Sequence, residues 1–297
     1  MQHLRYAFRF IGACFSLALK HPRLRKPVFN LWMGGMGLLT LWLIPMLGVI
    51  ALIGVRPLGL VLIGFFISLL LFSLLAWSGV TALETCLAFD DLTWIDLELP
   101  GSSQNKQDHA RWQQILLWTL LQPGLMINHL FNQILRPQHV EELAWLSGAY
   151  LMLPVIALED FNLKEGIDRI KQLLRDRLIR FHPSLISIHP LTGVVQWLLI
   201  GAGVLLGLKF GVKLAPFQTA GLLSRLLAVV VGTLIAGVLA LLGLSISSYN
   251  RSCYHTTLYQ WVLSVENARM TGDASQGAPP KLLSQVLKTN SRNQKES

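Results

Sequence analysis

Four long stretches of this chain contain no Asp, Glu, Lys or Arg: residues 27–55, 57–83, 181–208 and 226–250. A helix needs about 20 consecutive apolar residues to cross the hydrocarbon core of a bilayer, and each stretch is longer than that. Backbone hydrogen bonds inside lipid must be made within the chain, so these stretches are expected to be helices. The first two are separated by Arg56 alone, which predicts an antiparallel hairpin.

The composition agrees with a protein embedded in a membrane. Hydrophobic residues make up 53% of the 297 positions and charged residues only 14%, whereas soluble proteins carry about 25% charged residues. The net charge is +9, but the basic residues lie between apolar stretches and do not gather on one compact surface. This pattern argues against a nucleic-acid partner and predicts that the basic face attracts anionic lipid headgroups.

Two further segments, 113–135 and 142–158, are candidate spans. With both, the expected fold is an all-α polytopic transmembrane helical bundle of about six spans, accompanied by interfacial amphipathic helices. If these two segments form a re-entrant hairpin instead, the number of spans falls to four and the sides of the flanking loops stay the same.

The expected organisation is a basic amphipathic segment, a transmembrane helical domain, a cytoplasmic helix and a disordered tail. Their boundaries are 1–27, 28–250, 251–270 and 271–297, respectively. Within the transmembrane domain the expected spans are 28–54, 57–80, 113–135, 142–158, 191–208 and 224–248, with an amphipathic helix at 162–181.

Lys and Arg are divided unequally between the two sides of this bundle. Twenty lie in the N-terminal segment, in the loops after the second and fourth spans and in the C-terminal region, and four lie on the opposite side. Positive residues are enriched in cytoplasmic loops. We therefore expect both termini in the cytoplasm, in a bacterial inner membrane.

Two segments outside the firm spans carry apolar side chains at helical spacing. At the N-terminus these are Leu4, Phe8, Ile11 and Phe15. In 162–181 an apolar stripe lies opposite a charged face, and Asn162 with Glu165 matches a capping box. For 162–181 we expect an amphipathic, basic helix in the cytoplasmic headgroup layer; the alternative is a soluble helix packed on its neighbours.

The most site-like feature of the sequence is a group of polar residues inside 113–135. Lipid offers no hydrogen-bond partners to amides or imidazole. This helix is therefore expected either to line an aqueous or ligand cavity or to meet the headgroups. The residues are Gln122, Asn128, His129, Asn132 and Gln133.

A second candidate site follows the fourth predicted span, where Pro154 precedes Glu159 and Asp160. A proline inside a helix removes a backbone donor and can kink the helix. The two acids could bind a cation or a proton, cap the next helix or pair with Arg169.

Small residues recur every four positions on the last two spans. This spacing lets helix backbones approach closely in lipid. The alternatives are an intramolecular contact, which the position on consecutive helices favours, and a homodimer seam. The residues are Gly203, Gly207 and Gly211 on one span, and Gly232, Ala236 and Ala240 on the other.

The sequence contains no recognised catalytic motif. A Walker loop, HExxH, GxSxG and the dinucleotide-binding fingerprint are all missing. Cys14, Cys86 and Cys253 form no CxxC pair and are expected to be buried or lipid-facing thiols. We therefore expect no enzymatic activity, no cofactor and no metal.

The stretch 145–174, WLSGAYLMLPVIALEDFNLKEGIDRIKQLL, resembles an uncharacterised family of bacterial multi-helix membrane proteins, a domain of unknown function. In that family a helix ends in a proline followed five residues later by a glutamate, and an amphipathic segment with an Arg comes next. Pro154, Glu159, Gly166 and Arg169 match this pattern, whereas Ile170 replaces a small residue. The resemblance implies the same multi-span architecture over residues 1–250 and implies no activity.

The expected function is that of a non-enzymatic membrane component, either a permease-like or a lipid-handling helical bundle. The alternative is a non-catalytic membrane scaffold or assembly factor that holds a partner, and association with a second copy or another protein stays open. A cavity lined by 113–135 would favour the permease-like protein, and a closed, dry bundle would favour the scaffold.

Overall fold

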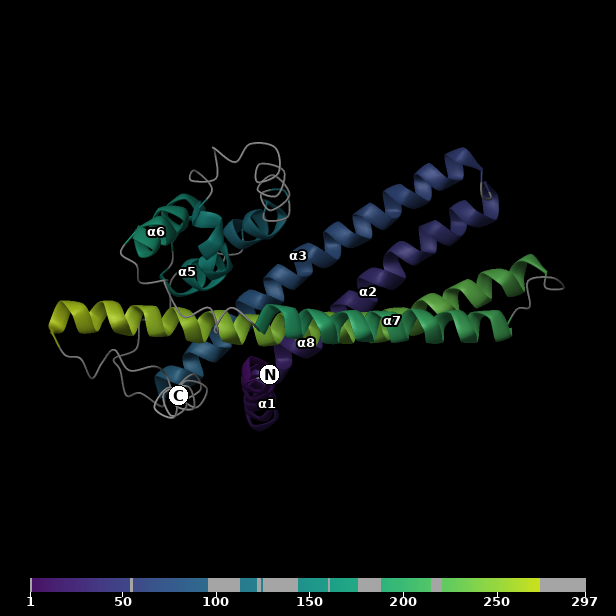
Figure 1. The fold of residues 1–297 in the computed structure, drawn as a ribbon. Helices are drawn as coiled ribbons and strands as arrows, with labels where there is room; N and C mark the ends of the chain where they lie inside the picture. The colour runs from purple at the N-terminus through teal and green to yellow at the C-terminus, as the bar shows by residue number, and fades with distance from the viewer. Residues whose placement is uncertain are drawn as a thin grey trace. The chain divides into compact units, whose positions relative to one another are not determined.

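A computed structural model of the chain describes residues 2–53, 56–95, 113–121, 124, 144–159, 161–175, 188–214 and 221–272. Throughout these ranges the regular secondary structure is helical and no strand occurs. The elements with defined bounds are α1 (Gln2–Lys20), α2 (Pro22–Leu52), α3 (Pro57–Ile95), the 3-10 helix η2 (Ala144–Leu151), α5 (Met152–Glu159), α6 (Leu163–Arg175), α7 (Ile188–Leu214) and α8 (Leu222–Thr271) (Figure 1).

Four helices, α2, α3, α7 and α8, are long and apolar enough to cross a membrane. The all-α fold class is therefore confirmed, and the protein is embedded in a membrane through these helices. Segment 142–158 corresponds largely to η2 and α5, and its apolar helix is shorter than the four. Only the first part of 113–135 lies within the described residues, so a count of six spans stays a prediction.

Helix α8 is much longer than a membrane span. It has 50 residues, which at 1.5 Å per residue is about 75 Å, more than twice the thickness of a hydrocarbon core. The predicted span 224–248 and the predicted cytoplasmic helix 251–270 are both parts of it. No Gly or Pro lies between Gly243 and Gly272 to interrupt the helix. Gly272 ends it with a φ of +72°, as is common for a helix C-terminus.

The chain divides into two compact units. Unit 1 contains Met1–Arg25, Ala82–Leu191 and Tyr249–Ser297, and unit 2 contains Lys26–Thr81 and Thr192–Ser248. The long helices α3 and α8 each contribute to both units, because each continues past its apolar stretch.

Unit 2 consists of the membrane-length portions of α2, α3, α7 and α8. Indole N–H groups connect α2 to α3 and to α8: Trp77 donates to the carbonyl oxygen of Asn30 at 3.1 Å, and Trp32 donates to that of Val238 at 3.2 Å. Most of the large exposed apolar side chains of the described chain belong to this unit. A surface of this kind fits contact with lipid and not with water.

Unit 1 has a buried core of its own, built from the end of α3, η2, α5, α6, α1 and the second half of α8. Its largest fully buried side chains come from every one of these elements. They include Phe10, Phe89, Leu151, Met152, Ile156, Ile170 and Tyr259. Helix α5 lies inside this core, because most of its side chains are buried.

Candidate functional site

The start of α6 is determined by a reciprocal pair of hydrogen bonds. The backbone N–H of Glu165 donates to Asn162 Oδ1 at 3.0 Å, and the backbone N–H of Asn162 donates to Glu165 Oε2 at 3.0 Å. Each bond satisfies a donor that the helix itself leaves unpaired. The next donor, the N–H of Leu163, bonds to Gln114 Oε1 at 3.1 Å and so connects α6 to the helix at 113–121.

One face of α6 packs against its neighbours in unit 1. Gly166, Ile170 and Leu173 are buried, and a Cβ atom at Gly166 would lie 2.9 Å from Met152 Sδ and 3.7 Å from Ile156 Cγ1. The lack of a side chain at Gly166 therefore lets α6 lie close to α5. The sequence left two alternatives for this segment, a helix in the headgroup layer and a helix packed on its neighbours. The buried face with Gly166, Ile170 and Leu173 is packed on its neighbours.

A second apolar stripe on α6 is not covered by protein to the same extent. Leu163, Ile167 and Leu174 are only half-buried, and their spacing of four and seven places them on one face. Exposed Lys164 and Lys171 border this stripe. Helix α6 thus combines a packed face with a partly open apolar face that has a basic edge.

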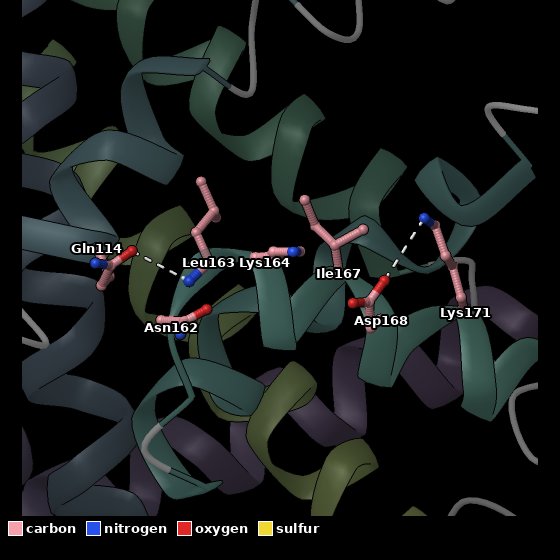
Figure 2. A pocket seen from close by; sticks show the side chains of 7 residues that line it. All are labelled: Gln114, Asn162, Leu163, Lys164, Ile167, Asp168 and Lys171. Carbon is pink, nitrogen blue, oxygen red and sulfur yellow. Dashed lines mark hydrogen bonds and ion pairs between the residues drawn. The ribbon is translucent and has the colours of Figure 1, made fainter.

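Leu163 and Ile167 of this face line a shallow, open groove with a volume of about 630 Å³ (Figure 2). Figure 2 shows Leu163 and Ile167 projecting from the same side of α6, with Gln114 toward one end and Lys171 toward the other. Lys171 Nζ lies 3.7 Å from Asp168 Oδ1, and both side chains are more than half exposed. Such a surface pair is worth little energetically, so the lysine remains available to another anion.

An ion cluster centred on Arg169 lies next to the packed face of α6. The guanidinium of Arg169 donates from Nε and Nη2 to the two carboxylate oxygens of Glu159, at 3.1 and 3.2 Å. It also donates from Nη1 and Nη2 to the two oxygens of Glu266, at 2.9 and 2.5 Å. The side chains are only 13–17% exposed. Arg169 therefore joins the end of α5, α6 and the end of α8.

This cluster strongly favours the charged form of Arg169. The hydrogen bonds to Glu266 are the main cause of a raised pKa at Arg169; burial opposes this shift, and the bonds to Glu159 add to it. Because one guanidinium engages both oxygens of each acid, the geometry supports the pairing alternative for Glu159 over binding of a separate cation. Asp160 lies outside the described residues. Glu266 was not among the residues predicted from the sequence.

The small residues of α7 lie against α8 of the same chain. A Cβ atom at Gly203 would be 2.7 Å from the carbonyl oxygen of Ala236, and one at Gly211 would be 3.1 Å from that of Ala228. At Gly207 it would overlap the carbonyl oxygen of Gly232. Ala240 is not among the nearest neighbours of these glycines, so the facing residues begin at Ala228, one turn earlier than the sequence suggested.

The predicted polar cluster, Gln122, Asn128, His129, Asn132 and Gln133, lies outside the described residues. Cys14, Cys86 and Cys253 are free thiols and are fully buried in unit 1. No group of three or more His, Cys, Asp or Glu side chains is placed to hold a metal ion within the part of the chain that the structure describes. No family model, curated protein or solved structure matches the chain.

Proposed function

We propose that this chain is a non-enzymatic, lipid-handling membrane protein whose α6 groove binds the headgroup region of an anionic phospholipid. The supporting observation is that apolar Leu163 and Ile167 line one groove together with Lys164 and Lys171, while Asp168 is the acidic residue in its lining. Apolar surface beside basic side chains is typical of helices that lie at the boundary between headgroups and acyl chains.

The helix at 113–121 supports the same proposal. Gln114, which lines the groove, shares a helix face with Leu117 and Leu121, three and seven residues further on. These two leucines are 46% and 43% exposed. Exposed leucines on this face would extend the apolar contact with lipid beyond the groove, and each lysine near an anionic surface would add about 1 kcal/mol of attraction.

Replacing both Lys164 and Lys171 by glutamine should weaken binding of phosphatidylglycerol by roughly thirtyfold, since two attractions of about 1 kcal/mol each are lost. The measurement is titration of the purified full-length protein with this lipid in a neutral detergent. The matched control is Lys209→Gln with Lys213→Gln, which removes the same charge from two exposed side chains of α7. Equal weakening in both variants would show that net charge alone causes the loss of affinity, and would contradict lipid binding in the groove.

The proposal requires that α6 faces the cytoplasm, where anionic lipid and the basic loops of this chain are expected to coincide. Reporter fusions after Gln104 and at the C-terminus should give cytoplasmic signals, and a fusion between positions 213 and 218 should give an external one. An external signal at the C-terminus would overturn this topology, whether the chain has four spans or six.

A membrane scaffold is the second candidate, and the Arg169 cluster favours it. That cluster holds α5, α6 and α8 together through two paired acids, as a rigid docking platform for a protein would require. Unchanged lipid binding after the double lysine substitution would favour the scaffold.

A further inference from the structure

Helix α1 has two different apolar faces, and only one of them is covered. On the covered face Phe10, Cys14 and Ala18 are 2%, 0% and 8% exposed. The rings of Phe10 and Tyr254 meet edge to face with centroids 5.5 Å apart, and the hydroxyl of Tyr249 donates to the carbonyl oxygen of Cys14 at 3.0 Å. These contacts hold α1 against the second half of α8 within unit 1.

The other apolar face of α1 is open. Phe8, Phe15 and Leu19 are 53%, 42% and 66% exposed, and their spacings of seven and four residues place them along one side of the helix. Gly12 lies on the same side, is exposed, and a Cβ atom added there would meet no other atom within 4 Å. Two phenylalanines and a leucine on one open stripe are costly to leave in water.

A basic edge runs along this open stripe. Arg9 and Lys20 are exposed and lie about 100° around the helix from Phe8 and Leu19, respectively. Exposed Arg23 follows just after the end of α1. The first acidic residue of the entire chain is Glu84, so α1 itself carries positive charge and no negative charge.

The connection between α1 and α2 is short and ties the C-terminal end of α1 to a membrane-length helix. His21 alone separates α1 from α2, and α2 is one of the four membrane-length helices. A one-residue connection cannot carry the end of α1 far from the point where α2 leaves the apolar layer.

We propose that α1 lies in the plane of the membrane surface, with Phe8, Phe15 and Leu19 inserted among the lipid acyl chains and Arg9 and Lys20 contacting anionic headgroups. The occupant of the open face is thus the phospholipid surface itself. Helix α1 then acts as a second lipid contact, separate from the α6 groove, and it anchors unit 1 to the bilayer through the packing of Phe10 and Cys14 on α8.

The test uses the full-length protein in nanodiscs of equal parts phosphatidylglycerol and phosphatidylcholine. Phe15→Cys and the neighbouring control Ser16→Cys are each labelled with an environment-sensitive fluorophore. Labelling of the unsubstituted protein gives the background signal from the three buried native thiols. At position 15 we expect blue-shifted emission and at least threefold stronger quenching by lipid with a nitroxide on the upper acyl chain. At position 16 we expect stronger quenching by aqueous iodide.

Equal exposure of both positions to iodide would overturn the proposal. A disulfide between two F15C copies, without lipid quenching, would assign the face to a second copy of the chain and would also overturn it. Phe8→Cys, on the same stripe, should repeat the result for position 15, which guards against a folding defect at one site. Arg9→Gln with Lys20→Gln should lower the quenching at position 15 when anionic lipid is present. These results do not depend on Lys164 or Lys171. The proposal for α1 can therefore fail while lipid binding in the α6 groove holds, and the reverse.

Discussion

Replacing Gly207 with leucine will strongly destabilise the protein. A Cβ atom at this position already overlaps the carbonyl oxygen of Gly232 and would lie 3.1 Å from the Cβ of Ala236. Both neighbours belong to α8, and a backbone carbonyl cannot rotate away as a flexible side chain can. Helices α7 and α8 must therefore separate, and such overpacking costs about 3 kcal/mol or more. The measurement is the free energy or midpoint of unfolding in a mild detergent.

Gly201 on the same helix provides the matched control. It is exposed, and an added Cβ would meet nothing within 4 Å, so Gly201→Leu should change the unfolding midpoint little. The alanine variants sharpen the comparison, because alanine favours a helix over glycine by about 1 kcal/mol. Gly201→Ala should be neutral or stabilising, whereas Gly207→Ala should be destabilising. Equal responses at the two positions would show that α7 and α8 do not pack through Gly207.

The fold class was predictable because it depends on one local property, the length of a charge-free stretch. Four of the long charge-free stretches, 27–55, 57–83, 181–208 and 226–250, correspond to the four membrane-length helices. How far each helix continues was not predictable in the same way. At Arg251 charge returns and a span must end, but a helix ends only where backbone geometry or a cap ends it. The chain offers no such residue until Gly272, so α8 continues into unit 1.

Burial of η2 and α5 illustrates a second limit. A short apolar stretch has the same composition whether lipid or protein covers it, so the sequence between 142 and 158 did not predict which side chains pack against protein, and whether this segment spans the membrane stays a prediction. The structure buries Val155, Ile156 and Ala157 within unit 1. Gly166 gives a local indication, because a small residue on the next helix permits close packing against this segment.

The candidate ion cluster was predictable only in part. Glu159 and Arg169 are ten residues apart, so their pairing was among the alternatives that the sequence suggested. Glu266 lies 97 residues beyond Arg169, and its role depends on the unbroken course of α8. Ala228 was missed for a related reason, since the repeat of small residues predicts a contact between two helices but does not determine their register.

Replacing Arg169 with methionine is the second change expected to have a large effect. Methionine keeps much of the length of the side chain but removes the charge that Glu159 and Glu266 share. Two carboxylates with little exposure would then face each other without a cation, and breaking a largely buried pair in this way costs about 3 kcal/mol. The partial exposure of these side chains, 13–17%, admits some water, so the expected loss lies at or below this figure.

Lys171→Met on the same helix is the matched control, because the ion pair of Lys171 with Asp168, at 3.7 Å, is more than half exposed on both sides. Its loss should change the free energy of unfolding by less than about 1 kcal/mol. A triple variant with Arg169→Met, Glu159→Gln and Glu266→Gln should recover much of the stability, since it also removes the unpaired charges. If Arg169→Met and Lys171→Met unfold at the same midpoint, the cluster does not stabilise unit 1. If Arg169→Met alone is destabilising and the triple variant recovers, the loss comes from the two unpaired acids and not from the volume of the arginine side chain.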